Sequence, residues 1–411
     1  MRFRDSFSDR RKGIANVKRK NFPLIFCVIL SALIMAGGCG GSSSSLVQTG
    51  PGLDSVISSM TLREKVGQMF MIRPETLYAQ ITPGELWQKI ASKDADIQTV
   101  LYTLTDEMEA TLKDYPAGGF ALFTQNLNTP SQVKRLISDL YDASETYPFI
   151  GIDEEGGRVA RLANKKSFDA EIQNVGPMES IGKTGDPQNA YNAANYIGGY
   201  LSDYGFNVDF APVADINTNP DNIVIGDRSF GTTAALVSEM AGAYLDGLHS
   251  RGVMGTLKHF PGHGDTTQDT HTGYVAVYKT WDELLNTELI PFIDNFSKTD
   301  MIMTEHITMK NVTSDDLPAT LSHTILTEKL RGELGYDGVI ITDSMEMGAI
   351  NQTYPSGEAA VMAVEAGADI VLLPYDYCTA FDAVVDAVES GRISETRINE
   401  SVRRILRLKM K

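Results

Sequence analysis

The chain has 411 residues, of which 42% are hydrophobic, so it is long enough for one large domain or two ordinary domains with a buried core. It contains 53 Asp and Glu against 36 Lys and Arg, a formal net charge of −17. The first 38 residues alone carry a charge of +6, which leaves −23 on the remainder. An acidic body of this kind repels nucleic acids and anionic lipid surfaces, so we expect neither as a partner.

The first 38 residues are predicted to be a signal segment. Their basic start runs into Leu24 to Met35, an apolar stretch that is too short to span a bilayer but has the length of a signal-peptide core. Small residues, Ala36 to Gly38, precede Cys39 and resemble a bacterial lipobox, although leucine is usual in place of Ala36. We therefore expect a lipidated Cys39, an extracytoplasmic protein anchored to the cell membrane, and a flexible tether over residues 39–52. Ordinary secretion and an uncleaved anchor are the alternatives.

Beyond the tether, short apolar runs alternate with amphipathic segments such as Asp282 to Phe296. A capping box of Thr61 and Glu64 marks the first helix. Residues 75–115 are polar and helical in pattern, and we expect an inserted helical pair that covers one side of the site. The runs that predict strands are Val66 to Ile72, Gly118 to Phe123, Pro148 to Asp153, Asn207 to Val213, Val253 to His259, Met301 to His306, Gly338 to Asp343 and Ile370 to Leu373.

Eight strand-and-helix units predict an α/β fold of the (β/α)8 TIM-barrel type, with a single catalytic domain over residues 53–411. In such a barrel the chemistry lies at the C-terminal ends of the strands. Polar residues stand at four of these ends: Asp153 to Arg158, Lys258-His259, Glu305-His306 and Thr342 to Ser344. No Gly-x-Gly-x-x-Gly follows a strand, which argues against a dinucleotide-binding sheet.

The run from Lys258 to His271 places three of the six histidines within fourteen residues, on a segment whose Pro and Gly residues predict a loop. Imidazoles at a strand end indicate proton transfer or metal ligation. The usual zinc spacings, His-x-His and His-Glu-x-x-His, are missing. Acid-base chemistry fits better, because Asp269 stands two residues before His271 and can orient its ring and raise its proton affinity.

This run resembles the signature of the β-N-acetylglucosaminidase subgroup of glycoside hydrolase family 3: Lys-His, Phe-Pro-Gly-His-Gly, then Asp-Ser/Thr-His. The resemblance implies a retaining exo-enzyme that hydrolyses terminal β-linked N-acetylglucosamine from cell-wall fragments or chitooligosaccharides, without a metal or other cofactor. Asp343, within Ile341 to Met347, matches the nucleophile position. His271 is implied as the general acid and base, with Asp269 orienting it.

The same resemblance implies that the sugar is held by Asp153, Arg161, Arg228, Lys258 and His259. A carboxylate accepts hydrogen bonds from sugar hydroxyls, and the cationic side chains donate to hydroxyl or acetamido oxygens. Many family 3 enzymes carry a second domain that supplies the acid/base residue. After Pro374 only helical material is expected here, so that role passes to the loop at Asp269 to His271.

Three other functions remain open. A histidine acid/base does not repel phosphate, so a phosphorylase of the same family is one alternative. A metal-dependent barrel hydrolase is the second, and it would use Asp343 with histidines drawn from His259, His263, His271 and His306. A lipoprotein that binds sugar without cleaving it is the third.

Overall fold

The computed structural model describes residues 51–266, 270 and 273–411. Residues 57–411 form one compact unit, and helix α1 (Pro51–Ser59) begins before it. The predicted signal segment, Cys39 and the tether up to residue 50 lie outside the described residues. Each helix in the described part is too short or too polar to cross a bilayer.

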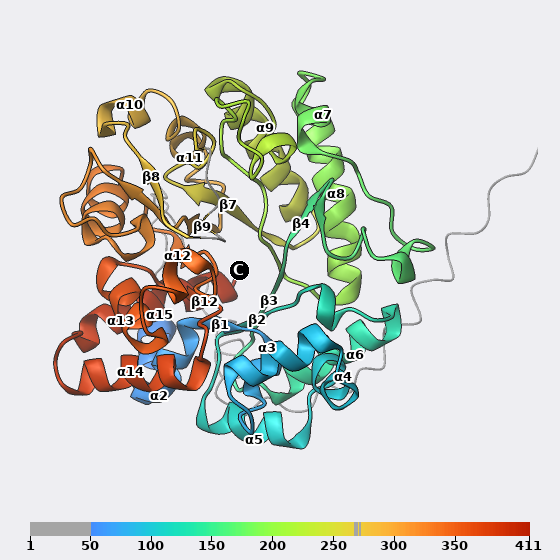
Figure 1. The fold of residues 1–411 in the computed structure, drawn as a ribbon, viewed down its shortest axis with the longest axis vertical. Coiled ribbons are helices and arrows are strands. Elements are labelled where there is room, and N and C mark those ends of the chain that lie inside the picture. The colour runs from blue at the N-terminus through green and yellow to red at the C-terminus, as the bar shows by residue number, and fades with distance from the viewer. Residues whose placement is uncertain (1–50, 267–269, 271–272) are drawn as a thin grey trace, which may run out of the picture. The chain divides into compact units, whose positions relative to one another are not determined.

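Eight parallel strands form the centre of the compact unit (Figure 1). Strands that follow one another around the sheet also follow one another in the chain, and β1 pairs with β12 as well as with β2. A parallel bridge between Ile341 and Ile370 joins the two ends of the sheet, so the barrel is nearly closed and the predicted fold is confirmed. The strands are β1 (Phe70–Ile72), β2 (Gly119–Ala121), β3 (Phe149–Ile152), β6 (Val208–Asp209), β7 (Met254–Phe260), β9 (Met301–Thr304), β11 (Val339–Thr342) and β12 (Val371–Leu372).

Helices surround the barrel, as Figure 1 shows, and bury the strands on their outer side. The strands are therefore mostly apolar, and Leu257, Ile302 and Ile340 have no solvent exposure. Helices α8 and α9 pack against each other, as do α13 and α14. The helices of the barrel wall are α2 (Leu62–Gln68), α6 (Pro130–Ala143), α7 (Met178–Gly182), α8 (Pro187–Tyr204), α9 (Ala234–His249), α10 (Trp281–Leu285), α11 (Ile290–Asp294), α12 (Gly348–Asn351), α13 (Ser356–Ala366), α14 (Tyr377–Glu389) and α15 (Glu395–Lys409).

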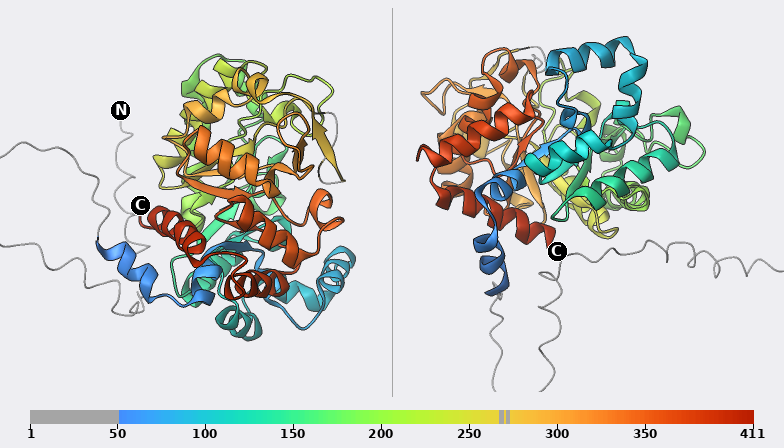
Figure 2. Two further views of the ribbon diagram at one scale, coloured as in Figure 1. Left: turned by 90° about the vertical axis from the view of Figure 1, so that its left-hand side faces the viewer. Right: turned by 90° about the horizontal axis from the view of Figure 1, so that it is seen from below.

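The C-terminal helices α14 and α15 lie beside α2, the first helix of the compact unit (Figure 2). Helix α2 begins with the predicted capping box, in which Thr61 and Glu64 exchange hydrogen bonds. The ammonium group of Lys65 on α2 lies 2.8 Å from the carboxylate of Glu395 on α15. The first and last helices of the barrel wall, α2 and α15, are thus in contact.

The insertion between β1 and β2 differs from the expected helical pair. It holds three helices, α3 (Pro83–Ser92), α4 (Ala95–Tyr102) and α5 (Asp106–Asp114), after the 3-10 turn η2 (Pro74–Leu77). Asp94 and Thr105 cap α4 and α5, and these two caps divide what looked like one helical stretch. Helix α4 packs against α6 of the barrel wall.

The sequence predicts one amphipathic element from Asp282 to Phe296, and this prediction is wrong. It forms two short helices, because the chain turns after α10 and Pro291 then stands in the first turn of α11. Proline is well placed in the first turn of a helix, where its missing N–H is not needed, and poorly placed in a helix interior.

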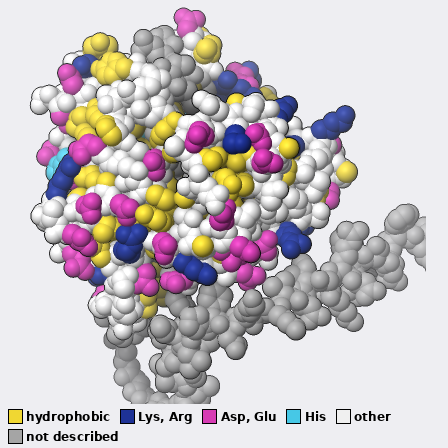
Figure 3. Space-filling view, turned by 60° about the horizontal axis from the view of Figure 1, so that its bottom comes forward, with side chains coloured by type: hydrophobic (Ala, Val, Ile, Leu, Met, Phe, Trp, Pro, Cys, Tyr) yellow, Lys and Arg dark blue, Asp and Glu magenta, His cyan; other side chains and the backbone are white. Residues whose placement is uncertain are grey.

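Several smaller elements lie outside the barrel sheet. β4 (Glu154–Gly156) pairs antiparallel with β5 (Val159–Ala160), and β8 (Val275–Val277) pairs parallel with β10 (Ile307–Met309). The remaining helical pieces are η3 (Thr124–Asn126), η4 (Lys166–Phe168), η5 (Gly226–Arg228), η6 (Ala319–Leu321) and the π-helical η7 (Thr324–Glu333). On the face that Figure 3 shows, basic side chains are scattered among acidic and hydrophobic ones.

Candidate active site

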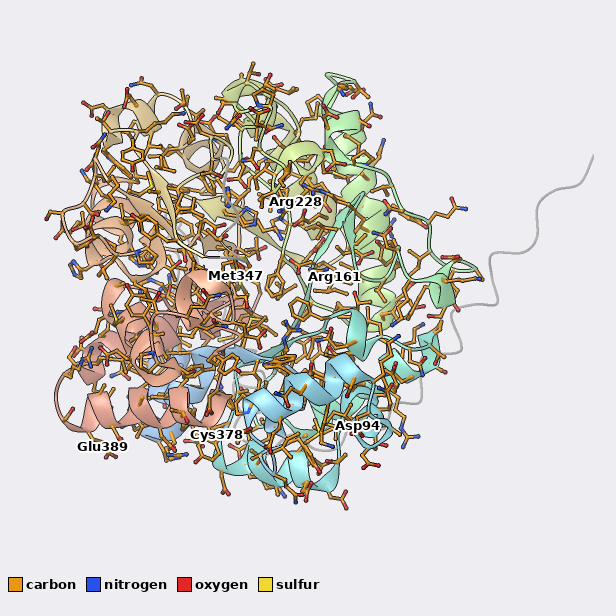
Figure 4. The ribbon with its side chains drawn as sticks, viewed as in Figure 1. Asp94, Arg161, Arg228, Met347, Cys378 and Glu389 are labelled. Carbon is orange, nitrogen blue, oxygen red and sulfur yellow. The ribbon has the colours of Figure 1, made fainter. Side chains whose placement is uncertain are left out.

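A cavity of about 140 Å³ lies at the C-terminal ends of the strands. Parallel strands end on the same side of a barrel, so side chains from β3, β7, β9 and β11 converge there. Figure 4 shows three of the lining side chains, those of Arg161, Arg228 and Met347, around the middle of the barrel. The cavity is lined by Asp153, Glu155, Val159, Arg161, Val224, Arg228, Lys258, His259, His263, Thr270, Met303, Glu305, Asp343 and Met347.

Lys258 is the centre of an ion-pair network at one side of this cavity. Its side chain is 2% exposed, and its Nζ lies 3.0 Å from Asp153 Oδ1 and 2.6 Å from Glu155 Oε1. Arg228 donates two hydrogen bonds to Glu155, of 2.7 and 2.8 Å, and Arg161 donates one of 3.0 Å to Asp153. Asp153, Arg161, Arg228 and Lys258, all predicted from the sequence to bind the sugar, are therefore brought together, with Glu155 as an unpredicted partner.

The network fixes the charge state of its carboxylates. Burial alone would raise the pKa of Asp153, but Lys258 and Arg161 outweigh it and hold the pKa well below its ordinary value. Burial opposes ionisation of Glu155 too, and Arg228 and Lys258 overcome it and lower the pKa to about 2. Both groups are thus ionised acceptors at neutral pH. Three cations with two carboxylates also leave N–H groups for a ligand's oxygen atoms.

His259 is held by Asp215, a buried carboxylate that sequence reasoning missed. Nδ1 of His259 donates to Asp215 Oδ2 at 2.7 Å, and the backbone N–H of His263 donates to Oδ1 at 2.7 Å. Burial lowers the pKa of His259, but Asp215 more than offsets this and raises it. With Nδ1 occupied, Nε2 is the nitrogen that lies near Arg228, at 3.3 Å. Asp215 follows the predicted strand Asn207 to Val213 by two residues, and that position at a strand end was the available signal.

Asp343 follows β11, as predicted. Its Oδ1 accepts the backbone N–H of Ser344 at 2.6 Å, and its own N–H donates to the carbonyl oxygen of Thr304 at 3.0 Å. These contacts hold the carboxylate at the rim of the barrel and leave Oδ2 for a substrate. Asp343 and the sugar-binding residues predicted from the sequence share one cavity.

Glu305 is a second carboxylate beside Asp343. The two groups and a ring nitrogen of His259 offer oxygen and nitrogen atoms that all lie within 4.8 Å of one another. Burial raises the pKa of Glu305, but His263, His259 and His306 outweigh it and the pKa is lowered. The sequence placed Glu305 at a strand end without a role, and only the structure shows that its side chain faces the cavity.

The other two histidines of the site differ in their contacts. His306 has its Nδ1 2.9 Å from the hydroxyl of Thr320 and its Nε2 2.9 Å from the carbonyl oxygen of Ser344, so it braces the backbone next to Asp343. His263 is buried, with Nδ1 2.7 Å from the hydroxyl of Thr266, and its Nε2 has no partner in the described part of the chain.

The predicted acid/base pair, Asp269 and His271, lies outside the described residues, so its role stays a prediction. Thr270, between them in the sequence, lines the cavity, and its carbonyl oxygen accepts the backbone N–H of Ala349 at 3.1 Å.

A second cavity of about 290 Å³ adjoins the first, and Asp153, Arg161, Met303, Asp343 and Met347 line both. Arg73 follows β1 and also lines the second cavity. Its guanidinium pairs with Glu346 at 2.9 Å and lies over the ring of Phe123 at 3.8 Å and that of Trp87 at 5.2 Å. Trp87 belongs to α3, so the insertion contacts a residue that lines this second cavity.

The family model and the similar curated proteins point to the same family. Residues 61–408 match the model of the glycosyl hydrolase family 3 N terminal domain. The chain is 34% identical over 342 residues to beta-hexosaminidase A of Pseudoalteromonas piscicida, an alignment covering 77% of this chain and 57% of that protein. It is also 34% identical over 270 residues to beta-hexosaminidase LpqI of Mycobacterium tuberculosis, covering 63% of this chain and 67% of that protein.

Among solved structures, a glycoside hydrolase family 3 beta-N-acetylglucosaminidase from Paenibacillus sp. str. FPU-7 superposes with a TM-score of 0.75 at 40% sequence identity. The match covers 86% of this chain and 62% of that one, so the chain spans little more than half the length of two of the relatives it matches. With its family model matched over the whole barrel, this chain belongs to glycosyl hydrolase family 3.

Proposed function

We propose that the chain is a retaining β-N-acetylglucosaminidase that removes terminal β-linked N-acetylglucosamine from cell-wall fragments or chitooligosaccharides. The observation that carries this proposal is the single cavity in which Asp343 faces the Asp153, Arg161, Arg228 and Lys258 network. The names of the relatives, beta-hexosaminidase and beta-N-acetylglucosaminidase, support the choice of sugar.

The geometry supports a double displacement. Oδ2 of Asp343 attacks the anomeric carbon as the bond to the leaving oxygen breaks, and His271 gives that oxygen its proton. A glycosyl ester on Asp343 results. His271 then takes a proton from water, the water oxygen attacks the same carbon, and the carboxylate of Asp343 leaves. The two inversions return the original β configuration.

The network around Lys258 supplies binding. Its ion pairs hold Asp153 and Arg228 in one orientation before the sugar arrives, so little side-chain entropy is lost on binding. A charged cavity of about 140 Å³ favours the end of a glycan chain over its middle, because a terminal sugar can enter it with its hydroxyls hydrogen-bonded. Exo-action is therefore part of the proposal.

A slowed 2-fluoro substrate tests the nucleophile directly. We expect its sugar to add covalently to the peptide that contains Asp343, and Asp343→Asn to lower kcat by at least about a thousandfold. Mass spectrometry of the digested protein locates the label. A label on another peptide, or full activity with no label at all, would contradict the assignment.

Two alternatives are separated from the proposal by simple assays. A phosphorylase needs inorganic phosphate for turnover and releases a sugar phosphate, whereas the hydrolase turns over at the same rate without phosphate. A metal-dependent hydrolase is suggested by the convergence of His259, Glu305 and Asp343. Exhaustive chelation abolishes its activity, whereas the double displacement proposed here needs no metal and survives chelation.

We also propose, from the first 39 residues, that the protein is lipid-anchored outside the cytoplasmic membrane. The apolar run before the small residues and Cys39 supports this proposal. Detergent partitioning of the native protein tests it against Cys39→Ser. The substitution is expected to prevent lipidation and move the protein from the detergent phase, and an unchanged distribution would contradict lipid anchoring.

A further inference from the structure

The carboxylates of the catalytic cavity are not all paired with cations. Four carboxylates line the cavity, against three Lys and Arg side chains. Asp153 and Glu155 share those three cations. Within the described part of the chain Glu305 and Asp343 form no ion pair, although the side chain of Glu305 is 1% exposed. Two unpaired carboxylates repel each other where the dielectric constant is low, so this side of the cavity favours a cation.

The neighbouring histidines do not remove this imbalance. His259 is already paired with Asp215, at 2.7 Å. The ring of His306 contacts a hydroxyl and a backbone carbonyl oxygen, and its backbone N–H donates to Oε1 of Glu305 at 2.8 Å. Burial opposes the ionisation of Glu305, but the charges of His263, His259 and His306 outweigh it and lower its pKa. Glu305 is therefore a carboxylate at neutral pH.

Glu305 lies beside the place where the reacting carbon must stand. One oxygen atom of Glu305, one of Asp343 and one ring nitrogen of His259 all lie within 4.8 Å of one another. A nucleophile stands about 3–3.5 Å from the carbon that it attacks before the bond forms. The substituent on C2 of the sugar belongs to the ring atom next to that carbon, which brings it within hydrogen-bond reach of Glu305. An acetamido N–H at C2 can donate one hydrogen bond to this carboxylate, whereas an ammonium group can form an ion pair with it.

We propose that the cavity also accepts terminal β-linked glucosamine, which carries a free ammonium group on C2 in place of the acetamide, and that Glu305 pairs with this ammonium. The inference rests on the proposed function, because it uses the same nucleophile, Asp343. The ammonium group is smaller than the acetamide, so it fits wherever the acetamide fits. It also supplies the positive charge that the cavity lacks.

The reaction breaks and forms the same bonds as the double displacement. The bond between C1 and the leaving oxygen breaks, and that oxygen takes a proton from the general acid. Water then supplies a hydroxyl group to C1 and returns the proton, while the ammonium group keeps its three hydrogen atoms. A positive charge on C2 disfavours the positive charge that develops on C1 in the transition state. The ionised carboxylate of Glu305 offsets this effect because it lies next to both.

Three chromogenic substrates with one leaving group test the proposal: the β-glucosaminide, the β-N-acetylglucosaminide and the β-glucoside, each assayed with a chelator present. The wild type is expected to cleave the glucosaminide with a kcat/KM at least about tenfold above that for the glucoside, since the two differ at C2 alone.

Glu305→Gln keeps the size of the side chain and an oxygen that accepts the N–H of His306. We expect it to lower kcat/KM on the glucosaminide by more than about tenfold, and on the N-acetylglucosaminide by less than about threefold, because an amide oxygen still accepts an amide N–H. Glu179→Gln is the matched control: it removes a surface carboxylate 2.9 Å from Lys183 and is expected to change neither value. Thermal melting of both variants shows that they are folded.

The outcomes separate this proposal from the proposed function. Cleavage of the N-acetylglucosaminide without cleavage of the glucosaminide overturns the proposal, and so does an equal loss on both substrates in folded Glu305→Gln. If the N-acetylglucosaminide is not cleaved, the proposed function fails. Calorimetric titration with glucosamine then still tests the binding: its Kd should rise more than about tenfold in Glu305→Gln, and an unchanged Kd contradicts the ion pair.

Discussion

Asp215 connects His259 of strand β7 to the loop that follows the strand. Its carboxylate, which is inaccessible to solvent, lies 2.7 Å from Nδ1 of His259 and accepts the backbone N–H of His263 at 2.7 Å. The ring of His259 therefore has one orientation, with Nε2 toward the cavity. In Asp215→Asn the negative charge is lost while the side chain keeps its size. We expect kcat/KM to fall by about 10 to 100-fold, the range found when a carboxylate behind a functional histidine is replaced.

The rise in KM should account for most of that fall, because His259 is proposed to bind the sugar. Steady-state kinetics on a chromogenic N-acetylglucosaminide separate KM from kcat. An Asp215→Asn enzyme with wild-type KM would show that His259 is positioned without its carboxylate partner.

Glu155 is the carboxylate on which two buried cations depend. Glu155→Gln leaves Lys258 and Arg228 without their shared anion, and we expect the free energy of unfolding to fall by about 3–5 kcal/mol. The matched control is Glu179→Gln, which breaks an ion pair of 2.9 Å with Lys183 on the surface of the protein. Its expected cost is about 0.3–0.5 kcal/mol. Denaturant unfolding of both variants makes the comparison, and equal losses would contradict the network's role in stability.

Gly264 lies where the loop after β7 passes close to the loop that follows β6. A Cβ at this position would stand 1.8 Å from the carbonyl oxygen of Ile216, a distance that no rotation of a side chain relieves. Gly264→Ala should therefore move the loop, with a loss of more than about 1 kcal/mol in stability and a marked fall in activity.

Gly84→Ala is its control. Gly84 lies in helix α3, where an added Cβ meets only the hydroxyl of Tyr375 at 3.9 Å. Alanine is the better helix former, so this variant should be neutral or more stable by up to about 1 kcal/mol. Melting temperature and kcat/KM of the two variants are measured side by side. Similar behaviour of both would show that the loop adapts freely.

Lys409 on α15 has no carboxylate partner among the described residues. Its Nζ donates to Gln68 Oε1 and to the carbonyl oxygen of Gly118, both at 2.7 Å, and lies over the ring of Phe149. Burial lowers its pKa to about 7. Between that pH and about 10.4, where a lysine of the unfolded chain titrates, the unfolded state binds the extra proton, so this residue makes stability rise with pH.

The prediction for Lys409→Met follows from this increase of stability with pH. The melting temperature of the wild type should rise from pH 7 to pH 9 relative to that of the variant, and the two curves should run parallel below pH 6. Differential scanning calorimetry over this range provides the measurement. A constant difference across all pH values would show that Lys409 stays charged in the folded state.

The barrel was predictable because its strands are short apolar runs at regular intervals, and a parallel sheet covered by helices needs just that pattern. The number of helices in the insertion was not predictable in the same way. Asp94 and Thr105 act as helix caps there, but in a polar segment such residues are common without ending a helix.

The candidate site was predictable where a residue type stood at a strand end within a recognisable motif, as with Lys258 and Asp343. Glu305 stood at a strand end as well, but the sequence does not tell whether its side chain or that of His306 faces the cavity. In the structure the side chain of Glu305 lines the cavity, whereas that of His306 contacts the carbonyl oxygen of Ser344. Asp215 had no motif, since it acts by holding another residue.

The cation–π contacts of Arg73 have a consequence for how this enzyme can diversify. One ring, that of Phe123, comes from the barrel, and the other, that of Trp87, comes from the inserted helices. The residues proposed to break the glycosidic bond all belong to other loops. Replacement of residues 75–115 by a different insertion would thus remove one of the two rings that hold Arg73 at the neighbouring cavity while the bond-breaking residues stay in place, so the two parts of the molecule can vary independently.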